Sequence, residues 1–133
     1  KSMKMSERLN LYKDRQRNNL SENAYGAIVR LRMDNSHPLG FGYDKEYLSL
    51  KLRNRRYAYL ESGWNVGTTQ DSTSIVSGFV GFKAKQNFRE SLVFGVEEIG
   101  RGSVVYMVDN PLFRGFWYNG KLLFGNAVFL VGN

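Results

Sequence analysis

The sequence contains no cysteine and only one histidine, His37. Without cysteine the chain can form no disulfide and no thiolate–metal bond, and it has no cysteine nucleophile. A catalytic zinc site commonly takes two histidines and a carboxylate from the protein, and one histidine cannot supply that set. We therefore expect no metal ligands, no cofactor and no catalytic residues in this chain.

Long apolar runs are also missing, because no stretch approaches the roughly 20 residues that a helix needs to cross a membrane. We therefore expect no membrane span. The apolar content itself is ample, since 42% of the 133 residues are hydrophobic and 14% are aromatic. That composition is typical of one folded domain with a core of its own rather than of a disordered segment.

Basic side chains outnumber acidic ones by 19 to 12, but the excess is unevenly distributed. Six basic and two acidic side chains lie in residues 1–17, and the remainder is only mildly basic. A nucleic-acid surface would spread its charge over a folded face with interleaved aromatic residues. We therefore expect no nucleic-acid partner, and we interpret residues 1–25 as a basic, mobile lead-in to a domain that spans 26–133.

Alternating side chains and turn residues predict a series of short strands. Ala27–Met33 alternates apolar and basic residues, as a half-exposed strand does. Tyr47–Leu52 alternates through its leucines, which predicts a second strand. Leu92–Glu98 and Ser103–Val108 flank a Gly-Arg-Gly turn, so we expect them to pair as a hairpin. Further short strands are expected at 39–43 and 57–60, a glycine-flanked turn around Trp64, and a short helix at 83–90.

The stretch that follows Pro111 predicts a largely buried C-terminal helix. Asn110 suits the N-cap and proline the first helical position, and apolar residues then recur at spacings of three and four. We place Trp117 inside, on this helix. The Asn119-Gly120 pair is also typical of a hairpin turn, which leaves a hairpin as the alternative. A strand that leads into a C-terminal helix indicates an α/β protein.

Four residues are weak candidates for a binding site. His37 lies in a polar turn, where it either bonds to the local backbone or lines a pocket. Tyr43 and Trp64 lie beside glycine-rich turns, where exposed rings could stack on sugars or peptide side chains and buried rings would fill the core. Asp109 follows a strand, a position where α/β proteins place ligands, although with Asn110 it could equally cap the next helix.

The segment GRGSVVYMVDNPLFRGFWYNGKLLFGNAVFLVG (100–132) resembles the closing segment of large bacterial zinc carboxypeptidase-family proteins. Three upstream segments resemble the same C-terminal domain in the same order: GAIVRLRMDNSHPLGFGY (26–43), SGWNVG (62–67) and SGFVGFKAKQNFRESLVFGVEEIGRG (77–102). In that family the domain is similar to class I glutamine amidotransferases. The resemblance implies a flavodoxin-like α/β domain, with a mixed sheet and a C-terminal helix, of which this chain is the later part.

The resemblance also implies a function. The chain would be a non-catalytic accessory domain of an exported, extracytoplasmic peptidase, and its partners would be the remaining domains of that parent protein. It would support stability, interdomain packing or substrate presentation. The His-x-x-Glu motif of the carboxypeptidase catalytic domain does not occur in the sequence, so the zinc that the family implies belongs to another part of the parent protein.

Two other functions remain as alternatives. The first is a carbohydrate- or peptide-binding module that uses the tyrosine- and tryptophan-rich turns. The second is an autonomous hydrolase, which would require a pocket in which His37 meets an aspartate and a serine. We also expect self-association, because a domain that lacks its upstream strand–helix units would leave a sheet face or edge uncovered.

Overall fold

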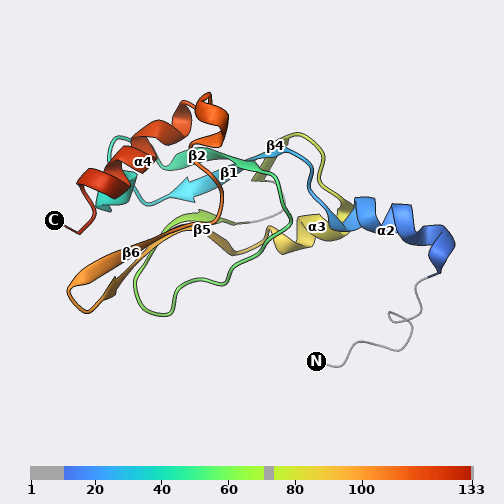
Figure 1. The fold of residues 1–133 in the computed structure, drawn as a ribbon, viewed down its shortest axis with the longest axis horizontal. Coiled ribbons are helices and arrows are strands. Elements are labelled where there is room, and N and C mark those ends of the chain that lie inside the picture. The colour runs from blue at the N-terminus through green and yellow to red at the C-terminus, as the bar shows by residue number, and fades with distance from the viewer. Residues whose placement is uncertain (1–10, 71–73, 133) are drawn as a thin grey trace.

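The computed structural model describes residues 11–70 and 74–132, in which the C-terminal helix lies against a curled sheet and two other helices lie together beyond one end of it (Figure 1). The strands are β1 (Ala27–Met33), β2 (Glu46–Lys51), β3 (Trp64–Thr69), β4 (Ile75–Ser77), β5 (Ser91–Ile99) and β6 (Gly102–Met107). The α-helices are α2 (Arg15–Glu22), α3 (Phe82–Asn87) and α4 (Asn119–Phe129), and the 3-10 turns are η1 (Tyr12–Asp14), η2 (Pro38–Gly40) and η4 (Phe113–Gly115). The sequence predicted this combination of a sheet with a C-terminal helix.

The sheet has the order β2-β1-β3-β5-β6, and β4 pairs with β1 beside β3. Every pairing among the described strands is antiparallel, so the expectation of a mixed sheet was wrong. The connections explain the difference. Parallel neighbours need a crossover of a dozen or more residues, usually helical, whereas the hairpin of β5 and β6 turns through Gly100 and Arg101.

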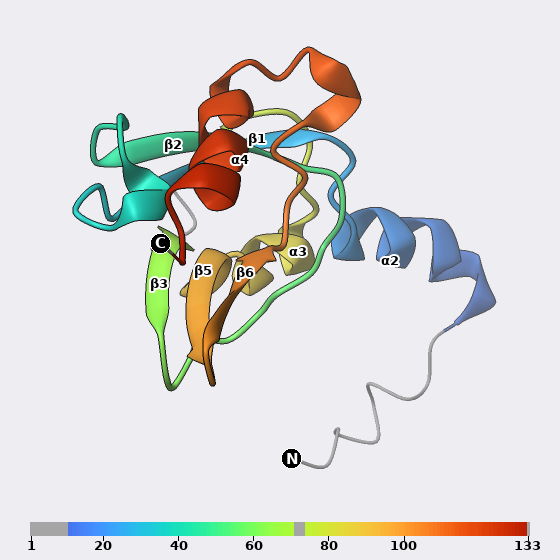
Figure 2. The same cartoon turned by 60° about the vertical axis from the view of Figure 1, so that its left-hand side comes forward.

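The sheet curls until its two edge strands approach each other. Lys51 at the end of β2 lies 3.1 Å from Asp109, which follows β6, measured from Nζ to Oδ1. Ser49 Oγ donates a hydrogen bond to Asp109 Oδ2 at 2.7 Å. Figure 2 shows α4 over the space between β2 and β6. The core therefore lies inside the curl, where Tyr47 packs edge-on against Phe94 with ring centroids 5.3 Å apart.

Both strands predicted from alternation were confirmed, and they differ in which residues face the core. β1 has the predicted bounds and buries the apolar side that the pattern indicates. β2 buries Tyr47, Ser49 and Lys51, and its leucines lie on the outer side, where Leu48 is exposed; Leu52, just beyond the strand, is exposed as well. The pairing with β1 decides which side of β2 is buried, because it sets Tyr47 opposite the buried Leu31. The large aromatic ring fills the core, and the strand's period of two then turns the leucines outward.

The C-terminal helix is shorter than predicted, because α4 begins at Asn119 and not at Pro111. The hairpin alternative was also wrong, since Asn119 and Gly120 form the first turn of the helix. Asn110 Oδ1 accepts a hydrogen bond from Leu112 N at 2.9 Å, so it stabilises a turn rather than a helix start. Gly120 permits this arrangement, because a Cβ there would collide with the Pro111 carbonyl oxygen.

Trp117 lies before α4 and is only half-buried, so its placement inside the helix was wrong. Its indole Nε1 donates to the Leu48 carbonyl at 3.3 Å, and Asn119 Nδ2 donates to the same carbonyl at 3.0 Å. These two bonds fasten the loop before α4 to the edge of β2. The tryptophan therefore anchors a loop through its polar atom and keeps part of its ring in solvent.

Three further expectations differ from the structure. Residues 57–60 form a loop across the start of β5, where the Tyr57 carbonyl accepts from Leu92 N at 2.9 Å. The segment 39–43 begins in the 3-10 turn η2, and Trp64 starts a strand where a turn was expected.

Of the lead-in, residues 1–10 lie outside the described residues and 12–22 are helical. Its mobility stays a prediction.

Candidate functional site

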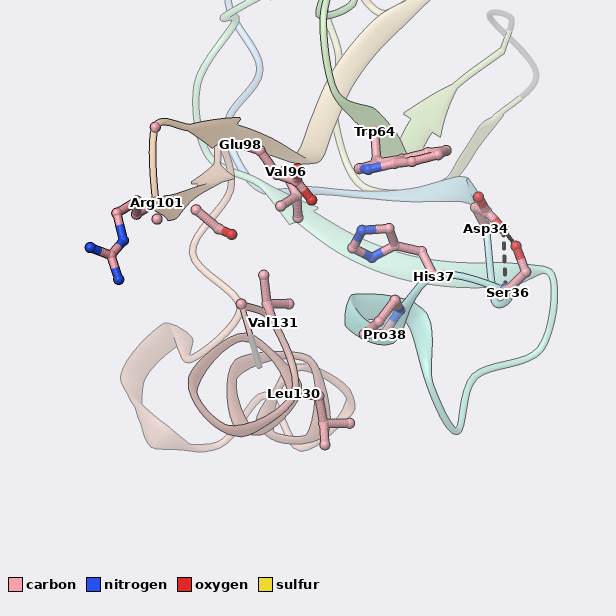
Figure 3. Close-up of a pocket in the computed structure, with 14 residues that line it drawn as sticks. Asp34, Ser36, His37, Pro38, Trp64, Val96, Glu98, Arg101, Leu130 and Val131 are labelled. Carbon is pink, nitrogen blue, oxygen red and sulfur yellow. Dashed lines mark hydrogen bonds between the residues drawn. The ribbon is translucent and has the colours of Figure 1, made fainter.

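A cleft of about 610 Å³ opens between the β5–β6 hairpin, the turn before η2 and the end of α4 (Figure 3). Segments that are far apart in the sequence form its walls, because the curl of the sheet brings the hairpin over the helix. The side chains labelled along it are Asp34, Ser36, His37, Pro38, Trp64, Val96, Glu98, Arg101, Leu130 and Val131. Two of the four candidate residues, His37 and Trp64, thus meet in one place.

His37 is half-buried at the start of η2. Its Nδ1 accepts a hydrogen bond from Leu39 N at 3.0 Å, which confirms the bond to the local backbone. Burial lowers the pKa of His37 below its usual value, and the nearby Asp34 carboxylate opposes this shift. In the neutral ring the proton then lies on Nε2, because Nδ1 is an acceptor. Figure 3 shows the ring among the residues that line the cleft.

Trp64 is the first residue of β3 and keeps 55% of its surface exposed. Its ring lies 6.0 Å from the His37 ring between centroids, tilted by 48°. The strand register shifts between Trp64 and Gly67, and such an irregularity changes the direction of a side chain. Asn65 secures the preceding loop, since its Oδ1 accepts from Leu60 N at 2.8 Å. A large aromatic ring is therefore held in solvent on a well-anchored strand.

Two carboxylates lie on the lining of the cleft. Asp34 Oδ1 accepts from the Ser36 hydroxyl at 2.6 Å and from Ser36 N at 3.1 Å. These two hydrogen bonds hold the pKa of Asp34 below its usual value, and the bond from the hydroxyl has the larger effect. The carboxylate therefore stays ionised. Glu98 lies near the end of β5 and is exposed. Arg101 occupies the hairpin turn, and its guanidinium points away from the cavity in Figure 3.

Asp34, Ser36 and His37 occur together, but they do not form a catalytic triad. The Ser36 hydroxyl donates to Asp34 instead of His37, and His37 Nδ1 is occupied by Leu39 N. A nucleophilic serine needs a hydrogen bond to its base and a base held by an acid. The arrangement therefore gives the hydrolase alternative no support.

Tyr43 lies away from this cleft and has a structural role. Its hydroxyl donates to the Asn119 carbonyl at 2.5 Å and accepts from Leu123 N at 2.8 Å. Burial raises the pKa of Tyr43, and the bond from Leu123 partly offsets that shift. Its ring also packs edge-on against Tyr47 at 5.5 Å between centroids. Tyr43 thus joins the first turns of α4 to the core and is not available to a ligand.

Asp109 is also unavailable to a ligand as a free carboxylate, since it accepts from Ser49 and pairs with Lys51. The Lys51 side chain is 1% exposed, and its ammonium lies 5.6 Å from the Phe88 ring centroid. The ammonium is at ion-pair distance from Asp109 but outside hydrogen-bond geometry. Sequence reasoning missed Lys51 and Ser49. The sequence did contain a signal for them. Ser49 and Lys51 follow Tyr47 at intervals of two residues, so all three lie on the same side of the strand.

One buried asparagine was also missed. Asn126 Nδ2 on α4 donates to the Leu39 carbonyl at 3.1 Å and to the Phe41 carbonyl at 2.7 Å. It thereby fixes η2, and with it His37, against the helix. The signal in the sequence was an amide in the middle of an apolar run, residues 124–131, since an amide on a buried face needs polar partners.

Within residues 11–70 and 74–132, no group of three or more histidines or acidic residues could hold a metal ion. Over the same ranges, no helix is long and apolar enough to cross a membrane. Comparisons with protein families, curated proteins and solved structures found no match to this chain. The structure is a small α/β domain with a curled antiparallel sheet and a C-terminal helix.

Proposed function

We propose that the chain is a non-catalytic accessory domain of an exported zinc carboxypeptidase-family peptidase, and that α4 packs against the remaining domains of that protein. The four segments that resemble this family support the assignment. The flavodoxin-like, class I glutamine amidotransferase-like fold and the extracytoplasmic location belong to the same proposal. The antiparallel sheet adds no support for that fold. The support for a role as an accessory domain comes from the surface of α4.

α4 is apolar over most of its surface, although only one side packs on the sheet. Leu123 and Asn126 are buried on the inner side. The outer side carries the exposed Phe124 and Val128 together with Lys121, the helix's one charged residue, and Leu122 is exposed on a flank of the helix. A helix that is hydrophobic all round is typical of one buried between layers. We therefore expect another domain to cover the outer side of α4.

The outer face of β2 extends this apolar surface. Leu48 and Leu52 are exposed there, and the Leu48 carbonyl receives the bonds from Trp117 and Asn119 that secure the start of α4. Exposed apolar residues that gather on neighbouring elements are typical of a surface that another part of a protein covers. The leucines of β2 and the outer side of α4 would then belong to one interface.

Val128→Glu in the full parent polypeptide tests this proposal, because Val128 is 55% exposed on α4. In the dilute isolated chain the change should alter the free energy of unfolding by no more than about 0.5 kcal/mol. In the parent polypeptide it should lower the unfolding temperature and speed proteolysis between the domains, since a charge would enter an apolar interface.

Val76→Glu is the matched control, since Val76 is 49% exposed on β4, away from α4 in Figure 1. It should leave the parent polypeptide unchanged. Equal behaviour of the two variants in the parent polypeptide would overturn the proposed packing of α4.

A carbohydrate- or peptide-binding module is the second candidate function. The observation that favours it is the meeting of His37 and Trp64 in one cleft, with an imidazole and a half-exposed indole on its lining. This function is compatible with the packing of α4, because Leu130 and Val131 line the cleft from beyond the end of that helix.

A further inference from the structure

The lining of the cleft indicates which class of ligand it fits. We propose that the cleft binds an organic cation with an aliphatic stem, such as the side chain of arginine or lysine in a peptide. This inference deepens the binding function proposed for the cleft and rests on it. It does not depend on the packing of α4.

The charges of the cleft favour a cation. The chain as a whole carries a net charge of +7, but Asp34 and Glu98 both line the cleft. The one basic side chain among the described lining residues is Arg101, whose guanidinium points away from the cavity (Figure 3). His37 adds no positive charge in its neutral form. The cleft is thus an acidic site on a basic protein, and it would attract a cation from solution.

Trp64 supplies the aromatic partner for such a cation. Its indole is 55% exposed and belongs to the cleft wall. A guanidinium or ammonium group over an indole face is attracted by the ring quadrupole, and tryptophan is the most effective aromatic residue for this contact. The anchored start of β3 holds the ring in place before a ligand arrives, so little side-chain entropy is lost on binding.

The remaining lining fits the stem of the cation. Leu130 and Val131 contribute apolar surface between the charged groups, and the buried Val96 lies behind them at the wall of the cleft. The methylene groups of lysine and arginine bury readily along apolar surface while the charged head stays among polar groups. A small inorganic cation would gain nothing from this apolar surface or from the indole.

A neutral sugar fits the lining less well. The lining offers the donors His37 Nε2–H, Trp64 Nε1–H and the Ser103 hydroxyl, but none of them is a cation, so a neutral polyol would leave the two carboxylates without a counter-charge. The Ser36 hydroxyl already donates to Asp34, and the Arg101 guanidinium points away from the cavity. A ligand that brings several donors and a positive charge matches two carboxylates better than a neutral polyol does.

The experiment titrates the full chain with acetyl-Gly-Arg-Gly-amide while NMR follows the indole N–H signals of Trp64 and Trp117. The Trp64 signal should shift saturably and the Trp117 signal should not, because Trp117 does not line the cleft. The same peptide with citrulline in place of arginine keeps the shape and lacks the charge. It should bind at least about tenfold more weakly, since it forms neither the ion pair nor the cation–π contact.

Glu98→Gln and Glu97→Gln form a matched pair of variants. Neighbouring residues of a strand point to opposite faces, and Glu97 instead bonds to Ser62 at 2.7 Å and Tyr106 at 2.8 Å. Glu98→Gln should weaken binding of the arginine peptide about fivefold, and Glu97→Gln should leave it unchanged. Trp64→Ala should abolish the binding. If Trp64→Ala does not fold, the difference in peptide binding between Glu98→Gln and Glu97→Gln tests the proposal.

Butylguanidinium and xylotriose complete the test. Binding of butylguanidinium as tight as that of the peptide would assign the site to free organic cations, and tighter binding of the peptide would assign it to basic peptide segments. Both results support the proposal. A Trp64 shift with xylotriose alone, equal binding of the citrulline peptide, or equal effects of the two glutamate variants would overturn it. None of these results bears on Val128→Glu, which probes the packing of α4.

Discussion

At the scale of single residues, Lys51 and Asp109 lose their contact with water together when the sheet curls. We predict that Lys51→Met lowers the free energy of unfolding by about 3–5 kcal/mol, because it leaves the Asp109 carboxylate buried without its cation. Urea denaturation followed by circular dichroism measures this change. Adding Asp109→Asn should recover most of the loss, since the amide oxygen still accepts from Ser49 and no charge remains.

Arg30→Gln is the control for this prediction. Arg30 pairs with Glu46 at 3.4 Å on an exposed part of the sheet, and loss of such a pair costs at most about 1 kcal/mol. If Lys51→Met is as stable as Arg30→Gln, or if the double variant is no better than Lys51→Met, the ion pair does not hold the sheet edges together.

His37 adds a dependence of stability on pH. Burial lowers its pKa in the folded chain below the unfolded value of about 6.5, so the unfolded chain binds the proton more readily. The contribution of His37 to stability is therefore complete above pH ~6.5 and is lost as the pH falls from there through the lower folded pKa. Protonation also removes the Nδ1 acceptor of Leu39 N.

NMR titration can measure this pKa without assignment difficulty, because His37 is the one histidine of the chain. We expect a value below 6.5, and the loss of stability between pH 6.5 and 5 should be smaller in His37→Gln. A titration at or above 6.5 would show that the ring is solvated and that Nδ1 does not accept from the backbone.

At the scale of elements, two adjacent leucines test how α4 lies on the sheet. Leu123 is 0% exposed and Leu122 is 45% exposed. We predict that Leu123→Ala lowers the free energy of unfolding by about 2–5 kcal/mol, as the loss of a buried leucine does. Leu122→Ala should cost less than about 1 kcal/mol in the isolated chain. Similar costs for both, measured by chemical denaturation, would contradict the observed orientation of the helix.

Several elements could be predicted from the sequence because their patterns were local. β1 and the β5–β6 hairpin follow from alternation and from a Gly-Arg-Gly turn, and both were confirmed. The start of α4 could not be predicted in this way. Pro111 and Asn110 suit a helix N-terminus, but the loop that they begin is bonded across the chain to β2 through Trp117. A long-range contact overrode the local preference.

The candidate site was only partly predictable for the same reason. His37 and Trp64 stand out as rare residue types beside turns, and the structure places both in the cleft. Tyr43 and Asp109 stand out equally, but long-range hydrogen bonds with Asn119 and Ser49 give them structural roles. Glu98 carries no local signal, and it joins the site because the hairpin projects over the end of α4.

At the scale of the whole molecule, apolar surface and an open strand edge predict self-association of the isolated chain. β6 carries no charged residue and pairs with β5 alone among the described strands. Uncovered edges and apolar patches of this kind tend to pair with another copy. We predict a mass above that of a monomer in sedimentation, together with binding of an apolar dye.

Val128→Glu should shift this equilibrium towards monomer, because it introduces a charge on the outer side of α4, and Val76→Glu should not. A wild-type chain that sediments as a monomer and binds no dye would mean that the exposed side of α4 is stable in water. The proposal of an accessory domain also predicts that co-expression with the upstream part of such a parent protein yields a monomeric and more stable domain.

The sequence by itself determined the composition of the chain, its α/β character and the strands whose side chains alternate. These features are local, because a strand's period of two and a hairpin's turn are set by neighbouring residues. Only the tertiary structure decided the antiparallel order, the curl, the side of β2 that is buried and the residues that meet at the cleft. Each of these depends on which distant segments pair. The placement of Tyr47 in the core, opposite Leu31, outweighed the preference of three leucines and left Lys51 inside with Asp109 as its counter-ion.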